Sequence, residues 1–252
     1  MLKEFKKDKL KVKVHSTRAE MGVAAAKDAT TIINQLLKEK ESINAIFAAA
    51  PSQNEFLETL RKETIDWNRI NAFHMDEYVD LHPDAPQGFA NFLRKKIFSK
   101  VVFKSVNCLD GNAADTEQEA RRYSALLAEY PADIVLMGIG ENTHIAFNDP
   151  HVADFNDKKL VKIVDLDLAC RQQQVNDGCF SEIANVPTHA LTLTVPALVK
   201  AKYVFCMVPS EKKAQAIYQT LNEDIQDNFP STILRKHPNA TLYLDKDSAK
   251  LI

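Results

Sequence analysis

Glycine is scarce in this sequence: only six of its 252 residues are glycine. No glycine-rich linker and no internal repeat divides the chain, so we expect one compact domain over residues 1–252. Cysteine is sparse as well, and its four positions form neither a CxxC pair nor a zinc-binding spacing. We therefore expect free thiols in a reduced, cytoplasmic protein.

Long apolar runs and a strong charge of either sign are also missing. No stretch approaches the roughly 20 apolar residues that span a bilayer, and the first residues lack the apolar core of a signal peptide. The formal net charge is −2, which argues against a nucleic-acid or membrane partner. The start of the chain, residues 3–13, interleaves lysine with Leu10 and Val12, a pattern typical of an edge strand with charged outward positions.

The sequence instead contains a regular alternation of apolar runs and amphipathic segments. Thr17 and Glu20 have the spacing of a capping box, which predicts the start of a long helix. The expected strands are 43–50, 69–75, 106–109, 133–137, 160–166, 190–195, 203–208 and 241–244, and the further expected helices are 53–62, 89–98, 115–130 and 211–221. This order predicts an α/β fold: a single three-layer Rossmann-like domain with a mostly parallel sheet and helices on both faces.

Residues 150–190 are the least regular part of the chain. They contain the run Gln172-Gln173-Gln174 and the turn-forming run Asn176-Asp177-Gly178. A mobile lid and a plain surface excursion are both compatible with this composition.

A histidine-bearing turn follows one of the expected strands. Residues 138–150 read GIGENTHIAFNDP and come directly after the apolar run at 133–137. Open α/β sheets bind ligands beyond the carboxyl ends of their strands, where His144 and Asp76 are both expected. A carboxylate and an imidazole in one crevice can move a proton between adjacent carbons. Alternatively, Asp76 ends a turn and His144 is a half-buried structural histidine.

Two other kinds of site find less support. The histidines considered as metal ligands lie on separate segments and lack HxxxH or HExxH spacing: His74, His82, His144 and His151. Gly138-Ile139-Gly140 begins like a dinucleotide-binding fingerprint, but Thr143 stands in place of the third glycine and the turn lies past the middle of the chain. We therefore expect no metal in the site and no cofactor.

Two segments resemble motifs of the glucosamine-6-phosphate deaminase family. HIAFND at 144–149, preceded by GIG, is similar to GxGxDGHIAFNEP, and MDEYVDL at 75–81 is similar to MDEYVGL. The resemblance covers most of residues 45–245. It implies a cofactor-free aldose–ketose isomerase and deaminase that converts glucosamine 6-phosphate and water to fructose 6-phosphate and ammonia. The related 6-phosphogluconolactonases continue with TAS, so residues 145–148 favour the deaminases.

The resemblance also implies roles for individual residues. Asp76 matches the carboxylate that carries a proton between C2 and C1, and His144 matches the histidine that assists opening of the sugar ring. Asp149 matches an acidic partner of that histidine. Lys213 matches a phosphate-binding lysine, although Lys212 is an equal candidate on chemistry alone. Further candidates for binding the substrate are Ser52, Gln53, Asn54, Glu77, Gly138 and Arg171.

The chain departs from the family pattern at three places. Asn142 replaces an acid two residues before His144, and we expect an aspartate restored there to favour the imidazolium. Activity on glucosamine 6-phosphate should then increase if Asn142 reflects drift alone, whereas activity on another epimer should fall if Asn142 is tuned to that sugar. Residues 49–54 replace a glycine-rich phosphate loop. The phosphate-binding arginine of the family has no clean match, because Arg171 lies near its place but Gln174 aligns better by count.

Three rival functions use the same crevice. Asn142, expected near the sugar ring, makes galactosamine 6-phosphate an alternative substrate, and lactone hydrolysis is the next alternative. Asn142 and the missing glycines of the phosphate loop also make a catalytically weak sugar-phosphate sensor an alternative. The expected partner is a small sugar phosphate, and assembly into a homo-oligomer stays open.

Overall fold

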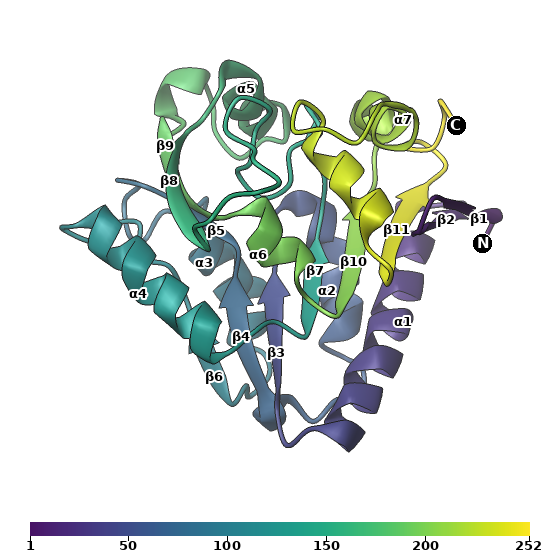
Figure 1. Cartoon of the computed structure of the whole chain (residues 1–252), viewed down its shortest axis with the longest axis horizontal. Helices are drawn as coiled ribbons and strands as arrows, with labels where there is room; N and C mark the ends of the chain where they lie inside the picture. Colours follow the sequence, from purple (N-terminus) through teal and green to yellow (C-terminus); the bar gives the residue numbers. More distant parts are fainter.

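A computed structural model describes all residues, 1–252, and is built around one eight-stranded sheet (Figure 1). The strand order is β1-β2-β11-β10-β7-β3-β4-β6, and every neighbouring pair is parallel except β1 with β2. These strands are β1 (Lys3–Lys7), β2 (Leu10–His15), β3 (Ile43–Phe47), β4 (Ile70–His74), β6 (Ser105–Asn107), β7 (Ile134–Met137), β10 (Tyr203–Val208) and β11 (Ala240–Asp245). The mostly parallel sheet expected from the alternation is confirmed.

Seven α-helices accompany the strands: α1 (Arg18–Glu39), α2 (Asn54–Leu60), α3 (Phe89–Leu93), α4 (Thr116–Glu129), α5 (Leu168–Asn176), α6 (Val195–Val199) and α7 (Ala214–Asn222). The capping box expected at the start of α1 forms, since the side chain of Thr17 accepts from the amide of Glu20 at 3.1 Å. Glu20 reaches back to the amide of Ser16 rather than to that of Thr17. None of the helices combines the length and apolar composition that crossing a bilayer requires.

Side-chain alternation along the strands produces two hydrophobic cores, one on each face of the main sheet. On β10, Phe205 and Met207 pack into the core that contains the buried face of α1 and α2. Val204 and Cys206 of the same strand point the other way, into the core that contains the buried faces of α4 and α7. The three-layer arrangement expected from the sequence follows from this period of two.

A second, three-stranded antiparallel sheet was not expected. It has the order β5-β9-β8 and consists of β5 (Asp76–Tyr78), β9 (His189–Leu193) and β8 (Val161–Asp165). The runs at 160–166 and 190–195 are indeed strands, but they do not join the main sheet. After β4 the chain leaves that sheet at Met75 and pairs with β9, so Asp76 lies opposite Thr192. Apolar patterning reveals strands but not their partners, which is why the pairing was missed.

Smaller differences concern the ends of the chain and the irregular region. Residues 3–13 form a hairpin rather than one edge strand: β1 is the edge, and β2 lies inside the sheet beside β11. Residues 150–190 contain the regular helix α5, capped by the side chain of Asp167, which accepts from the amide of Cys170. The helix expected over 211–221 begins as the 3-10 turn Glu211–Lys213 and continues as α7. The lid motion suggested for residues 150–190 stays a prediction.

Candidate active site

A pocket opens at the carboxyl ends of four neighbouring parallel strands, β10, β7, β3 and β4. The chain continues from β3 to β4 on one side and from β7 to β10 on the other, so strand order reverses between β3 and β7. Ligands of open α/β sheets bind at such a reversal. The wall of the pocket includes Gln53, Asp76, His144 and Lys213, which come from four separate segments after these strands.

Asp76 presents an unpaired carboxylate to this pocket. It stands at the start of β5, is only 7% exposed, and makes no hydrogen bond through its side chain. Burial, and then the nearby charge of Glu77, raises the pKa of Asp76 well above its ordinary value. A carboxylate with a raised pKa is a stronger base than an ordinary one, as proton abstraction from carbon requires.

Glu77, the next residue, has a different environment. Its carboxylate accepts from the amides of Phe89 at 3.0 Å and Ala90 at 2.8 Å, at the beginning of α3. It also lies 3.6 Å from Nε2 of His74. Burial alone would raise the pKa of Glu77, but His74 and these two amides together hold it below its ordinary value. Glu77 is thus a structural acid that anchors α3 and does not face the pocket.

Gly140 makes room for the ring of His144 in the loop after β7. A Cβ atom at position 140 would lie 2.1 Å from Cε1 of the imidazole, far inside a van der Waals contact. The backbone of Gly140 also accepts from the amide of Thr143 at 3.1 Å and donates to the carbonyl of His144 at 2.9 Å. Thr143 and Ala146 adopt positive φ angles of 70° and 48°. The loop is therefore tightly folded around the histidine that it presents.

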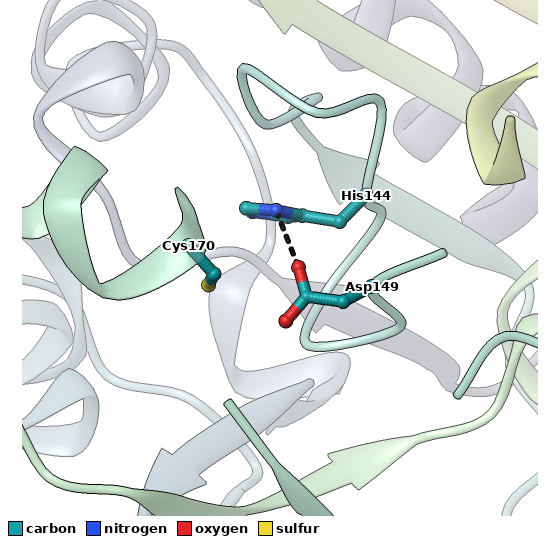
Figure 2. A group of neighbouring side chains, drawn as sticks. All are labelled: His144, Asp149 and Cys170. Carbon is teal, nitrogen blue, oxygen red and sulfur yellow. Dashed lines mark ion pairs between the residues drawn. The ribbon is translucent and has the colours of Figure 1, made fainter. Parts of the chain in front are cut away.

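The inner edge of the His144 ring faces two oxygen atoms. Nδ1 lies 2.7 Å from Oδ1 of Asn142. It also lies 3.1 Å from Oδ1 of Asp149 (Figure 2). Asp149 is fully buried. Burial alone would raise the pKa of Asp149, but hydrogen bonds from His144 and Asn142 hold it below its ordinary value. A carboxylate on Nδ1 orients the imidazole and stabilises its charged form.

Cys170 of α5 completes a buried group with His144 and Asp149, and their donor atoms lie within 4.8 Å of one another (Figure 2). Such a trio resembles a set of metal ligands. Burial, and then the charges of Asp149 and Asp167, raises the pKa of the Cys170 thiol well above its ordinary value, which disfavours the thiolate that metals bind. Because Nδ1 and Asp149 are also engaged in hydrogen bonds, the group is better explained as the support of His144.

Lys213 supplies a cation at another part of the pocket wall. It ends a 3-10 turn after β10, is 5% exposed, and its ammonium group has no hydrogen-bond partner in the protein. Burial lowers the pKa of Lys213, while the charges of Asp177 and Glu141 oppose this shift. Lys212 is exposed and donates to the carbonyl of Asn176 at 2.7 Å. The structure thus distinguishes the two lysines that the sequence left equal.

Ser52, Gln53 and Gly138 lie together in the pocket wall with Lys213. Gln53 Nε2 donates to Oγ of Ser52 at 3.1 Å and to the carbonyl of Met207 at 3.2 Å. A Cβ atom at position 138 would approach Gln53 Nε2 to 3.1 Å, so the glycine keeps the amide in place. A hydroxyl, an amide and an ammonium group form a surface suited to an anion.

Five expected site residues lie outside the pocket wall: Asn54, Glu77, Asn142, Asp149 and Arg171. Glu77 anchors α3, and Asn54 is the first residue of α2. Arg171 donates to the carbonyls of Ile183 at 2.8 Å and Val186 at 2.9 Å, so its guanidinium fastens α5 to the next loop. Contact of Glu77, Asn54 and Arg171 with the substrate therefore stays a prediction, which their place outside this pocket wall does not favour. Oδ1 of Asn142 lies 2.7 Å from Nδ1 of His144 and Asn142 does not line the pocket, so its expected place near the sugar ring stays a prediction.

Three residues that reasoning from the sequence missed belong to the site. Gln173 and Asp177 of the α5 region line the pocket together with Gln174, the residue that aligned with the family's arginine by count. Asp167 accepts from the amide nitrogen of Asn142 at 3.1 Å. An aspartate directly before the segment Leu168–Asn176 is a recognisable N-cap signal, and it could have revealed α5.

Comparison with known proteins places this geometry in context. A family model described as "Glucosamine-6-phosphate isomerases/6-phosphogluconolactonase" matches residues 16–243. A glucosamine-6-phosphate deaminase of Bacillus cereus (strain B4264) is 32% identical over 220 residues, which cover 87% of this chain and 82% of the relative. A glucosamine-6-phosphate deaminase of Bacillus thuringiensis (strain Al Hakam) is 31% identical over the same shares.

Solved structures are similar over nearly the whole chain. A monomeric glucosamine-6-phosphate deaminase superposes with a TM-score of 0.87 at 27% identity, covering 96% of this chain and 99% of that one. A 6-phosphogluconolactonase from Thermotoga maritima superposes with a TM-score of 0.77 at 19% identity, covering 94% of this chain and 100% of that one. The second likeness concerns the fold alone.

Proposed function

Because the chain belongs to the glucosamine-6-phosphate isomerase/6-phosphogluconolactonase family, we propose that it converts glucosamine 6-phosphate and water to fructose 6-phosphate and ammonia. The observation that carries this proposal is the buried, unpaired carboxylate of Asp76 in the same pocket as His144. Isomerisation needs a base for a C–H proton, whereas hydrolysis of a lactone needs only an activated water. The relatives with 31% and 32% identity are named as deaminases, which supports the same choice.

In the proposed reaction, the 6-phosphate binds beside Lys213, with Ser52, Gln53 and Gly138 around it. His144 then assists opening of the ring by moving a proton at Nε2, the ring nitrogen without a hydrogen bond. Asp76 removes the C2 proton while the aldehyde oxygen O1 takes up a proton from the substrate's ammonium group, which gives an enolamine. Asp76 then returns its proton to C1, which gives a protonated imine at C2. Water adds to that carbon and ammonia leaves, so fructose 6-phosphate remains. No redox step and no cofactor is required.

The main argument for galactosamine 6-phosphate as the substrate is weakened. That alternative rested on Asn142 near the sugar ring, but Asn142 hydrogen-bonds to the far edge of the imidazole and does not line the pocket. The four free cysteines support the proposal that the enzyme acts in the reducing cytoplasm.

The test compares turnover of glucosamine 6-phosphate, galactosamine 6-phosphate and 6-phosphogluconolactone, measuring ammonia, the ketose 6-phosphate that forms (fructose 6-phosphate or its C4 epimer) and 6-phosphogluconate separately. We expect equal amounts of both products from glucosamine 6-phosphate and the highest kcat/KM for that substrate. A preference for the galactose epimer would change the substrate but not the mechanism. Lactone hydrolysis without ammonia release, or binding without turnover, would overturn the proposal.

A further inference from the structure

Asp167 connects helix α5 to the loop that carries His144. Its Oδ1 atom caps α5 by accepting from the amide of Cys170 at 2.6 Å. Its Oδ2 atom accepts from Nδ2 of Asn142 at 3.1 Å. The backbone amide of Asp167 in turn points to Oδ2 of Asp149 at 3.5 Å. One residue from outside the loop thus contacts both side chains that support the imidazole.

The amide group of Asn142 can adopt only one orientation in this network. Its nitrogen donates to Oδ1 of Asp149 at 2.9 Å and to Asp167. Its oxygen accepts from the backbone amide of His144 at 3.2 Å and faces Nδ1 of the ring at 2.7 Å. If the amide were turned over, its oxygen would face two carboxylates and its nitrogen would face the amide of His144. Nδ1 of His144 must therefore carry a proton, because its two neighbours are acceptors.

We propose that Asp167 is a positioning residue: through Asn142 it holds His144 in the tautomer protonated at Nδ1, which leaves Nε2 free to accept and return a proton. The catalytic consequence rests on the proposed function, whereas the tautomer itself does not. The family pattern has a carboxylate at position 142. In this chain the side-chain amide of Asn142 takes that position, and it connects the imidazole to the carboxylate of Asp167.

The same contacts change the expectation for an aspartate at position 142. That carboxylate would stand between Asp149 and Asp167, at the place where an N–H group now donates to both. Three carboxylates at hydrogen-bond distance cannot all remain ionised, so one of them would take up a proton. The other titratable groups beside these acids are the thiol of Cys170 and the imidazole of His151. We therefore expect Asn142→Asp alone to lower activity, contrary to the expectation from the sequence.

An exchange of the two side chains tests the proposal most sharply. The single variants Asp167→Asn and Asn142→Asp are compared with the double variant. In the double variant the carboxylate stands at position 142 and the amide at position 167, the reverse of the wild-type arrangement. Asparagine caps helices as well as aspartate, so α5 should persist. Loss of a charge-assisted hydrogen bond predicts a kcat about 10-fold to 100-fold lower in each single variant. The double variant should recover most of that loss, with little change in KM throughout.

Asp115→Asn is the matched control, because Asp115 caps α4 in the same way outside the pocket. It should leave kcat and its pH profile unchanged. Asp167→Asn, by contrast, should lower kcat with little change in KM, and Asn142→Asp in the same chain should restore it. Loss of thermal stability without these kinetic changes would indicate a purely structural residue and overturn the proposal.

A measurement without substrate separates this inference from the proposed function. ¹⁵N NMR of the His144 ring in the full-length chain should show one neutral tautomer, protonated at Nδ1, and a mixture of tautomers in Asp167→Asn. If the wild-type chain turned over no amino-sugar phosphate, the proposed function would fail while this test of Asp167 would still stand. The inference is overturned if Asp167→Asn leaves the tautomer unchanged, or if the double variant is less active than both single variants.

Discussion

Asp76 and Glu77 are neighbours in β5, yet their pKa values move in opposite directions. Asp76 is buried without a hydrogen bond, and its pKa lies well above the ordinary value. Glu77 is also buried, but His74 and the amides of α3 hold its pKa below the ordinary value. When the environments of two adjacent acids shift their pKa values in opposite directions, one acid can be catalytic and the other structural. We assign the base to Asp76 and the anchor of α3 to Glu77.

Asp76→Asn should abolish isomerisation while leaving substrate binding largely intact. Loss of a general base lowers the rate by about 10²–10⁴-fold. The measurement is kcat for ammonia release, with binding of glucosamine 6-phosphate followed by calorimetry. A variant with nearly wild-type kcat would remove Asp76 from the mechanism.

The same substitution should increase stability at neutral pH. Because the folded-state pKa of Asp76 is raised, the wild-type protein loses stability as the pH rises from the ordinary carboxyl value through the raised one. Asparagine cannot ionise, so Asp76→Asn escapes that loss. The difference in free energy of unfolding should therefore be small at low pH and grow across this window. Urea unfolding at several pH values measures it, and a difference that shrinks with rising pH would contradict the burial of an ionisable carboxylate.

Lys213→Ala should chiefly raise KM. The ammonium group is proposed to bind the 6-phosphate, distant from C1 and C2, so the ground state and the transition state lose similar energy. Loss of one charge-assisted contact predicts about a 10-fold to 100-fold increase in KM. Lys212→Ala is the matched control, because Lys212 is exposed and contacts Asn176 instead. A larger KM effect for Lys212 would contradict our placement of the phosphate.

Gly140→Ala should lower kcat without unfolding the protein. The added Cβ would lie 2.1 Å from Cε1 of His144, so the ring must move away from Asn142 and Asp149. Misplacement of a reacting group by about 1 Å can cost about 10²-fold in rate. Steady-state kinetics and the midpoint of thermal unfolding check both parts of this expectation. Unchanged kcat would show that the position of the ring is not critical.

The fold could be predicted in large part because a parallel sheet has strong local signals. Apolar runs gave the strands, and the period of 3.6 residues gave the helices, including the capped start of α1 at Thr17. Those signals do not report which strands pair. Nothing in residues 75–81 distinguishes continuation of β4 from a turn into β5, so the small antiparallel sheet was not foreseen. Its pairing depends on contacts with β9, more than 100 residues later.

The candidate site was partly predictable for a related reason. The carboxyl ends of parallel strands meet at one edge, so Asp76 and His144 were expected together, while Lys213 was expected through the family resemblance; the structure brings all three into one pocket. The direction of each side chain was not predictable. Arg171 is two positions from the pocket-lining Gln173 in α5, but its guanidinium donates to backbone carbonyls instead. Asp167 acts through another residue and carries no motif of its own.

The account depends most directly on proton transfer from C2 by Asp76. Glucosamine 6-phosphate deuterated at C2 can be converted in ordinary water while NMR follows the deuterium. We predict that the wild-type enzyme releases the label from C2, with part of it at C1 of fructose 6-phosphate and the rest in water, and that Asp76→Asn leaves the label on unreacted substrate. Release of deuterium from C2 by Asp76→Asn at the wild-type rate would contradict the account.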